Sequence, residues 1–191
     1  MLKSQFQKNL IEAGCDEVGR GCIAGPVVAA AVIMPPDYKN KNIMDSKKLS
    51  PKKREFVEKE IIKNARSCAI ASVSNNTIDK INILNASILA MHRALDKLDI
   101  KPEFILVDGN QFKQYKKLRH ECVIKGDNKY QNIAAASILA KNYRDKLMHD
   151  LSSSFDKYSW ETNFGYPTKK HRESIKEYGV TEYHRKSFKL I

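Results

Sequence analysis

The chain has 191 residues, 42% of them hydrophobic, and its 34 Lys and Arg against 22 Asp and Glu give a net charge of +12. This length and hydrophobic share are enough for one folded domain with a core, which excludes a globally disordered protein. The positive charge favours a polyanionic partner, nucleic acid first, although a lysine-rich surface also serves solubility alone.

The N-terminal residues MLKSQFQKNLIEAG lack the apolar core of a signal peptide. The longest apolar run, residues 24–34, is too short for a membrane span. The four cysteines form no C-x-x-C pair, which indicates reduced thiols rather than a zinc site or a disulfide framework. We therefore expect a cytoplasmic protein with no membrane association.

The first half of the chain predicts three strands and one helix. Residues 11–16 and 27–34 are short apolar runs typical of strands, and residues 68–73 form a third. Between the second and the third, Ser50 as a cap and Pro51 in the first turn predict the start of a helix.

The second half alternates helix and strand. One long helix is predicted from a cap at Asn76 or Thr77 to Leu98, because apolar residues recur every three or four positions. Further patterns predict strands at 104–107 and 121–124 and helices at 132–151 and 169–178. This order predicts an α/β fold with a mixed β-sheet flanked by helices.

Three predicted strands end on acidic residues, namely Asp16 with Glu17, Asp108 and Asp127. Loops at the carboxyl ends of such strands commonly carry the functional site. Mg²⁺ is held by a few carboxylates plus substrate phosphate, so these four acids predict a two-metal site. Any one of them alone would favour a solvated turn residue instead.

Residues 19–25, GRGCIAG, have the glycine spacing of a dinucleotide-binding loop. Such a loop should open a helix, yet Pro26 and a β-branched, alanine-rich run follow, and the nearby carboxylates would repel a pyrophosphate. A cation between carboxylate and phosphate removes this conflict, and the glycines then let the backbone approach a sugar. Asp16 and Glu17 are neighbours on a strand, so one shared site requires the strand to end or distort there.

Six segments, in order along nearly the whole chain, resemble bacterial ribonuclease HII. They are DEVGRGCIAGPVVAAAV (16–32), DSKKLSPKKRE (45–55), ILVDGN (105–110), KGDNKYQNIAAASILAKNYRDKLM (125–148), GYPTKKH (165–171) and HRKSF (184–188). Several long segments in the right order are far more specific than one motif. Val18 stands where that family usually has alanine, which is a small change.

The resemblance implies a single ribonuclease H-like domain over residues 1–191, with a small helical C-terminal segment (residues 155–191) that contacts substrate. It implies a metal-dependent endoribonuclease that hydrolyses the RNA strand of RNA–DNA hybrids and incises duplex DNA 5′ of single ribonucleotides, leaving 3′-hydroxyl and 5′-phosphate ends. The cofactor would be Mg²⁺ or Mn²⁺, two ions with substrate bound, and the enzyme a monomer.

The resemblance also implies a set of functional residues. Metal binding and catalysis would fall on Asp16, Glu17, Asp108 and Asp127. Ribose recognition would fall on Gly19, Arg20 and Gly21, and Tyr166 would pack on the adjacent sugar. Contacts near the substrate phosphates would fall on Ser46, Lys47, His184 and Arg185.

Alternatives remain for some of these residues and for the whole chain. By itself Tyr166 beside Pro167 would be a turn aromatic, Lys47 part of a solvated lysine run, and Arg185 the partner of a nearby carboxylate. The chain as a whole has the alternative of a basic nucleic-acid-binding protein without chemistry. The strand-end acids oppose that alternative, because negative charge at the contact surface weakens binding to phosphate.

Overall fold

The computed structural model describes residues 1–191, and a five-stranded sheet of order β3-β2-β1-β4-β5 lies at its centre. The strands are β1 (Glu12–Val18), β2 (Val27–Ile33), β3 (Ser67–Val73), β4 (Phe104–Asp108) and β5 (Arg119–Val123). β2 pairs antiparallel with β1 and β3, whereas β4 pairs parallel with β1 and β5. The sheet is therefore mixed, and the predicted fold class is confirmed.

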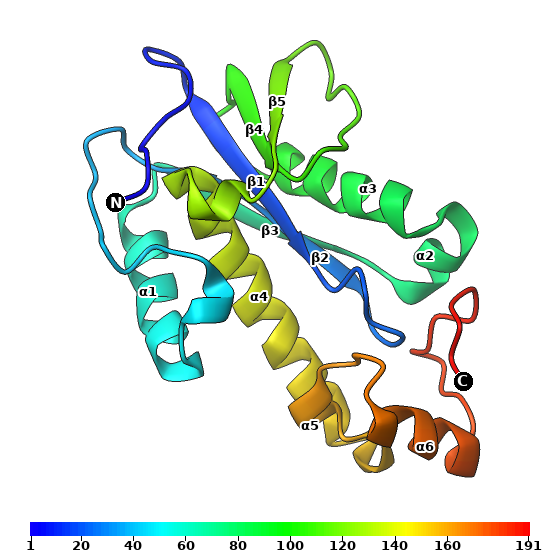
Figure 1. The fold of residues 1–191 in the computed structure, drawn as a ribbon. Helices are drawn as coiled ribbons and strands as arrows, with labels where there is room; N and C mark the ends of the chain where they lie inside the picture. Colours follow the sequence, from blue (N-terminus) through cyan, green and yellow to red (C-terminus); the bar gives the residue numbers. More distant parts are fainter.

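Helices cover both faces of this sheet (Figure 1). They are α1 (Pro51–Asn64), α2 (Asn75–Ile81), α3 (Ile83–Asp96), α4 (Gln131–Ser152), α5 (Trp160–Asn163) and α6 (Lys169–Tyr178). One face packs against α2 and α3, and the other packs against α1 and α4. None of these helices is both long and apolar enough to cross a membrane.

β2 is buried along its whole length because helices cover it on both sides. Its alternating side chains divide between the two faces: Ala29 and Ala31 join the cluster under α2 and α3, while Val28 and Ala30 join the cluster under α1 and α4. This double burial explains why the strand reads in the sequence as an unbroken apolar run.

The predicted long helix over residues 76–98 is wrong in one respect, because the structure divides it at Asn82. Asn82 has a φ of 66° and a ψ of 166°, a backbone conformation that no helix can contain. Its side chain accepts a hydrogen bond from the N–H of Asn85 at 3.1 Å and so caps α3. Ser74, rather than Asn76 or Thr77, caps α2.

Helix α4 lies unusually close to β1. A Cβ atom built on Gly14 would lie 2.3 Å from the carbonyl carbon of Asn132, so only glycine permits this approach. The close contact brings the middle of α4, including Ser137, beside the carboxyl end of β1.

The loop that joins β1 to β2, residues 19–26, is held between two parts of the C-terminal segment. The N–H of Ile23 donates to the carbonyl of Gly165 at 2.8 Å, and the N–H of Gly25 donates to the carbonyl of Tyr183 at 2.9 Å. Figure 1 shows the end of the chain returning from α6 toward α2, alongside this loop. The C-terminal segment therefore completes the surroundings of the β1–β2 loop.

Candidate active site

A pocket of about 270 Å³ lies at the carboxyl ends of β1 and β4. It brings together the four predicted acids and most of the predicted substrate-binding residues. Its lining residues are Asp16, Glu17, Val18, Gly19, Arg20, Gly21, Ser46, Lys47, Asp108, Asp127, Ser137, Lys141 and Tyr166.

The end of β1 explains how two neighbouring acids reach one pocket. The parallel pairing with β4 stops at Cys15 opposite Val107, whereas the pairing with β2 continues to Val18. Asp16 and Glu17 therefore lie beyond the part of β1 that β4 covers. The sequence required β1 to end or distort at these two acids. In the structure β1 loses its pairing with β4 there but keeps its pairing with β2.

Asp16 is buried and Glu17 is half-buried, and both lie close to other negative charges. The Asp16 carboxylate accepts a hydrogen bond from the N–H of Glu17 at 2.7 Å, and Arg20 donates to Glu17 Oε1 at 3.1 Å. Burial raises the pKa of Asp16 well above its ordinary value, and the charges of Glu17 and Asp108 raise it further. Burial also raises the pKa of Glu17, while Arg20 opposes that rise.

Asp108 ends β4, and Asp127 lies in the turn after β5. The N–H of Gly126 donates to Asp108 Oδ1 at 2.6 Å, which ties this turn to the end of β4. Burial raises the pKa of Asp108, and the charge of Asp127 adds to the effect. Asn128 donates to Asp127 Oδ1 at 2.9 Å.

The chemistry of this donor set fits a divalent cation that prefers oxygen ligands, such as Mg²⁺ or Mn²⁺. Burial is the main cause of the raised carboxyl pKa values and repulsion between the acids adds to it; a bound cation would offset both. No group of three or more His, Cys, Asp or Glu side chains is already arranged around one metal position. Each acid accepts at least one hydrogen bond within the protein, and its remaining lone pairs would serve for ligation, with substrate phosphate completing the coordination.

The two glycines of the GRG triplet (Gly19, Arg20 and Gly21) are glycine for different reasons. Gly19 has a φ of +93°, and a Cβ there would lie 2.3 Å from Nε of Arg144, so this glycine serves the fold. At Gly21 a Cβ would meet only Cε1 of Tyr166, at 3.9 Å. The absence of a side chain at Gly21 therefore leaves space in the pocket.

Ser46 and Lys47 approach the pocket from the short helical turn before α1. Ser46 is buried, and its hydroxyl lies 3.0 Å from the hydroxyl of Ser137. The N–H of Lys47 donates to Asp45 Oδ1 at 3.0 Å, so the side chain of Asp45 caps this turn. Both residues line the pocket, and their place near the substrate phosphates stays a prediction.

Two pocket residues on α4, Ser137 and Lys141, were missed by the sequence analysis. They are four positions apart and so share one face of the helix. Lys141 donates to Asp145 at 2.6 Å, which holds its charge at the pocket wall. The available signal was this pair of polar residues within the apolar run AAASILAK.

His184 and Arg185 do not line the pocket, and both side chains are fully buried. They were expected near the substrate phosphates, and their burial means that the structure does not place their side chains for direct contact with a phosphate in this pocket. Arg185 is also not paired with a carboxylate: its Nη1 donates to the carbonyl of Arg20, and its Nε donates to the carbonyl of Gly25, both at 3.0 Å. Arg185 is buried because the β1–β2 loop turns its carbonyls inward and needs buried donors, whereas His184 is buried among the rings of His171, Tyr158 and Trp160.

The sequence model of the family "Ribonuclease HII" matches residues 13–191. The ribonuclease HII of Christiangramia forsetii is 57% identical over 186 residues, covering 97% of this chain and 94% of that protein. The ribonuclease HII of Bacteroides fragilis is 56% identical over 191 residues, covering 100% and 95%.

Solved structures agree in fold. The ribonuclease H2 of Pyrococcus horikoshii superposes with a TM-score of 0.80 at 25% identity, covering 94% of each chain. The Archaeoglobus fulgidus ribonuclease HII, solved in complex with PCNA, gives a TM-score of 0.79 at 29% identity, covering 95% of this chain and 96% of that chain. A Bst ribonuclease HIII solved with Mn²⁺ shares the fold at 19% identity and a TM-score of 0.74, with 94% of this chain and 67% of that chain covered. With these matches spanning almost its whole length, the chain belongs to the ribonuclease HII family, metal-dependent endoribonucleases that act on RNA–DNA hybrids.

Proposed function

We propose that this enzyme also incises duplex DNA on the 5′ side of a single embedded ribonucleotide and leaves 3′-hydroxyl and 5′-phosphate ends. The observation that carries the proposal is the composition of one pocket. Four carboxylates suited to metal ions and the backbone of residues 19–21, suited to a sugar, line the same 270 Å³ space. Hydrolysis at a phosphate and recognition of the neighbouring ribose would therefore take place in the same pocket.

Asp16, Glu17, Asp108 and Asp127 would hold Mg²⁺ or Mn²⁺, with two ions present when substrate is bound. A bound ion supplies Lewis acidity and lowers the pKa of a water molecule, which turns it into a nucleophile. The four side chains contribute concentrated negative charge in a partly dehydrated pocket. Because burial raises the pKa values of Asp16, Glu17 and Asp108, protons would compete with metal for these carboxylates more strongly as the pH falls.

Ribose recognition would rest on the backbone of Gly19, Arg20 and Gly21. The 2′-hydroxyl is both a donor and an acceptor, and it distinguishes RNA from DNA at a single position. Because Gly21 has no Cβ atom, its backbone can come close to that hydroxyl. Tyr166 is 36% exposed, and its ring would pack on the adjacent sugar. A hydroxyl held in this way would also position the scissile phosphate, so the contact would act in the transition state.

Phosphate contacts would come from lysines at the pocket wall and from the C-terminal segment. Lys47 and Lys141 both line the pocket, and the net charge of +12 supplies a long-range attraction to either strand. Ser46 would act through its hydroxyl on the same side. The exposed residues of the C-terminal segment would extend the contact along the duplex.

A cleavage assay on matched duplexes tests the proposal. One position carries ribose, 2′-deoxyribose or 2′-O-methylribose, and each duplex is incubated with Mg²⁺, with Mn²⁺ and with EDTA. We expect metal-dependent cutting 5′ of the ribose only. Equal cutting of the ribose and deoxyribose duplexes would refute the proposed ribonucleotide recognition, and binding of every duplex without cutting would support the non-catalytic binding protein.

The remaining expectations concern the state of the protein in the cell. We infer that it works in the cytoplasm as a monomer. Support comes from its four free cysteines, none of which forms a disulfide, since reduced thiols are typical of that compartment. Light scattering at several protein concentrations tests the oligomeric state, because a monomer keeps one mass throughout.

A further inference from the structure

Two adjacent buried residues, His184 and Arg185, each reach one of the two segments that frame the sugar side of the pocket. Arg185 reaches the GRG triplet, since its Nη1 donates to the carbonyl of Arg20 at 3.0 Å. In a trans peptide the C=O and N–H groups point in opposite directions. Holding the Arg20 carbonyl inward therefore turns the N–H of Gly21 away from the buried guanidinium, and that N–H has no acceptor within the protein.

Burying the guanidinium of Arg185 lowers the stability of the fold. It is completely buried, its Nη2 has no hydrogen-bond partner, and burial lowers its pKa to about 10. A buried unsatisfied donor normally requires an explanation beyond packing. The bonds to the carbonyls of Arg20 and Gly25 supply that explanation, because they set the course of the β1–β2 loop.

His184 reaches Tyr166 through a second histidine. The N–H of Thr181 donates to His184 Nδ1 at 2.9 Å, so the ring proton of neutral His184 lies on Nε2. That nitrogen lies 3.2 Å from His171 Nε2, which also accepts from Trp160 Nε1 at 3.0 Å. The proton of His171 is therefore on Nδ1, where it donates to the carbonyl of Tyr166 at 2.9 Å.

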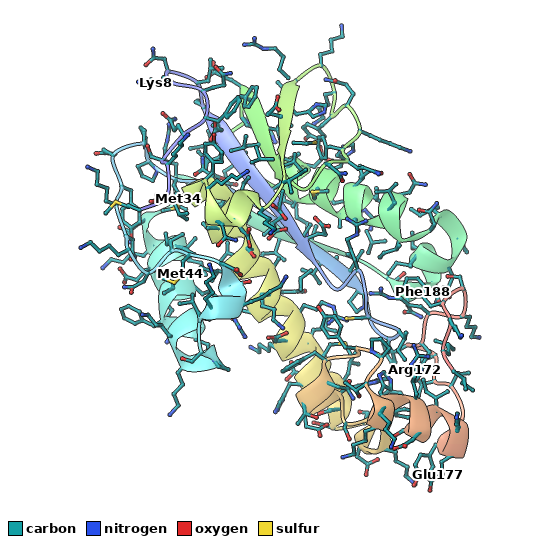
Figure 2. The ribbon with its side chains drawn as sticks, viewed as in Figure 1. Lys8, Met34, Met44, Arg172, Glu177 and Phe188 are labelled. Atoms are coloured by element: carbon teal, nitrogen blue, oxygen red, sulfur yellow. The ribbon has the colours of Figure 1, made fainter.

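The segment that carries both residues is fixed from its other side by α2. Asn75 donates to the carbonyl of Glu182 at 2.7 Å. Asp79 accepts from the backbone N–H groups of Lys186 and Ser187, each at 3.0 Å. Figure 2 shows Phe188 of this segment near the end of α2, with Arg172 marking α6. The hydrogen bonds from His184 and Arg185 therefore start from a rigid support.

We propose that His184 and Arg185 are positioning residues for ribose recognition, Arg185 by orienting the Arg20–Gly21 peptide and His184, through His171, by fixing the backbone of Tyr166. Neither residue touches substrate. The proposal rests on the proposed recognition of a 2′-hydroxyl by this enzyme. It assigns the C-terminal segment a role in choosing the sugar, separate from any contact with phosphate.

The test measures affinity by fluorescence anisotropy in EDTA, for an all-DNA duplex and for the same duplex with one ribose. One or two neutral hydrogen bonds to the hydroxyl should make wild type bind the ribose duplex about three- to tenfold more tightly. Arg185→Met should bring this ratio to about one without weakening all-DNA binding. Arg185→Lys, which keeps one donor, should retain part of the preference and serves if the Met variant does not fold.

Two variants of His171 test the hydrogen bonds that lead from His184 to the backbone of Tyr166. His171→Leu removes the donor to the Tyr166 carbonyl and should reduce the ribose preference. His171→Asn places an amide N–H near the position of Nδ1 and should restore it in part. Tyr158→Phe is the matched control, because it removes a hydrogen bond to the carbonyl of Gly179 in the same aromatic cluster but touches neither framing segment.

Melting temperatures are recorded for every variant to separate stability from recognition. Tyr158→Phe should lower the melting temperature and keep the wild-type ribose preference. If Arg185→Lys and His171→Leu keep the full preference, or if they weaken both duplexes equally, the positioning role is refuted. If wild type itself shows no ribose preference, the proposed recognition of the ribonucleotide fails instead.

Discussion

Gly21 and Tyr166 are in direct proximity at the pocket: a methyl group on Gly21 would lie 3.9 Å from Cε1 of the Tyr166 ring and would touch nothing else within 4 Å. The backbone at Gly21 also has no positive φ. The protein itself therefore has no steric reason to require glycine there. If a substrate sugar occupies that space, glycine is required by the ligand rather than by the fold.

The first prediction separates the two glycines of the GRG triplet. Gly21→Ala should keep the wild-type melting temperature and all-DNA affinity, yet lower the rate of cutting at a single ribonucleotide by at least about tenfold, or about 1.4 kcal/mol in activation free energy. Gly19→Ala should instead lower the melting temperature, because the new Cβ meets Arg144 and the backbone has a positive φ. Thermal melts and single-turnover cleavage measure both effects, and a fully active Gly21→Ala enzyme would place the sugar elsewhere.

The second prediction concerns Asp108. Asp108→Asn keeps an oxygen that can accept the hydrogen bond from the N–H of Gly126. It removes the negative charge of a carboxyl group whose pKa is raised by burial. The variant should lose cutting by orders of magnitude and bind duplex almost normally. Without metal it should be more stable than wild type at neutral pH, since a carboxyl group with a raised pKa destabilises the fold when ionised.

Denaturant unfolding in EDTA and single-turnover cleavage in Mg²⁺ provide the two measurements for Asp108→Asn. Asp99→Asn is a control outside the pocket, which should leave the cutting rate unchanged. An Asp108→Asn enzyme that retains more than about a tenth of the wild-type rate would remove Asp108 from the metal ligands.

The third prediction is a loss of stability in acid caused by His184. Burial and the neighbouring His171 lower the pKa of His184 to about 4. Between the ordinary pKa near 6.5 and this value, the unfolded chain binds a proton that the folded chain does not. The contribution of neutral His184 to the free energy of unfolding is thus complete above pH 6.5. It is lost as the pH falls toward 4, by about 3 kcal/mol in all.

Urea unfolding at several pH values between 7 and 4 measures this loss. His184→Gln, which does not titrate, should show a shallower fall in unfolding free energy than wild type. The raised carboxyl pKa values act in the opposite direction and are common to both proteins, so the difference isolates His184. Parallel pH profiles would show that the histidine is not held neutral in the folded state.

The fourth prediction concerns Lys47 and salt. Duplex affinity should fall with salt in a log–log plot, with a slope of about 0.9 for each phosphate contact. Lys47→Gln should reduce that slope by about 1 and weaken ribose and all-DNA duplexes alike. Lys63→Gln, on α1 away from the pocket, should leave the slope unchanged, and a similar change in both variants would mean that Lys47 makes no specific contact.

Much of the catalytic end could be predicted from the sequence because it follows from local rules. Asp16 and Asp108 follow buried apolar runs, and the carboxyl ends of parallel strands meet at one edge of a sheet. Ser50 and Pro51 marked the start of α1 in the same direct way. In these places neighbouring residues alone determine the outcome, so the pattern was sufficient.

Other features depend on partners far away in the chain. The charged HRKSF segment is typical of a surface, yet Arg185 is buried because it bonds to the carbonyl of Gly25, 160 positions earlier. The break at Asn82 left no mark in the apolar spacing, which runs through it from Ile81 to Leu84. Helix α5 has four residues, too few to show any helical period.

Helix α4 carries residues for three different tasks on one face, at positions three or four apart. Ser137 and Lys141 line the pocket of the four acids, Arg144 donates to the carbonyls of the β1–β2 loop, and Met148 packs with Trp160 under the C-terminal segment. The helical rise of 1.5 Å per residue thus sets the distance from the pocket to that layer at about 16 Å. One residue inserted between Ser137 and Arg144 would turn everything beyond it by about 100°, so the length of α4 between the pocket and the C-terminal layer is fixed.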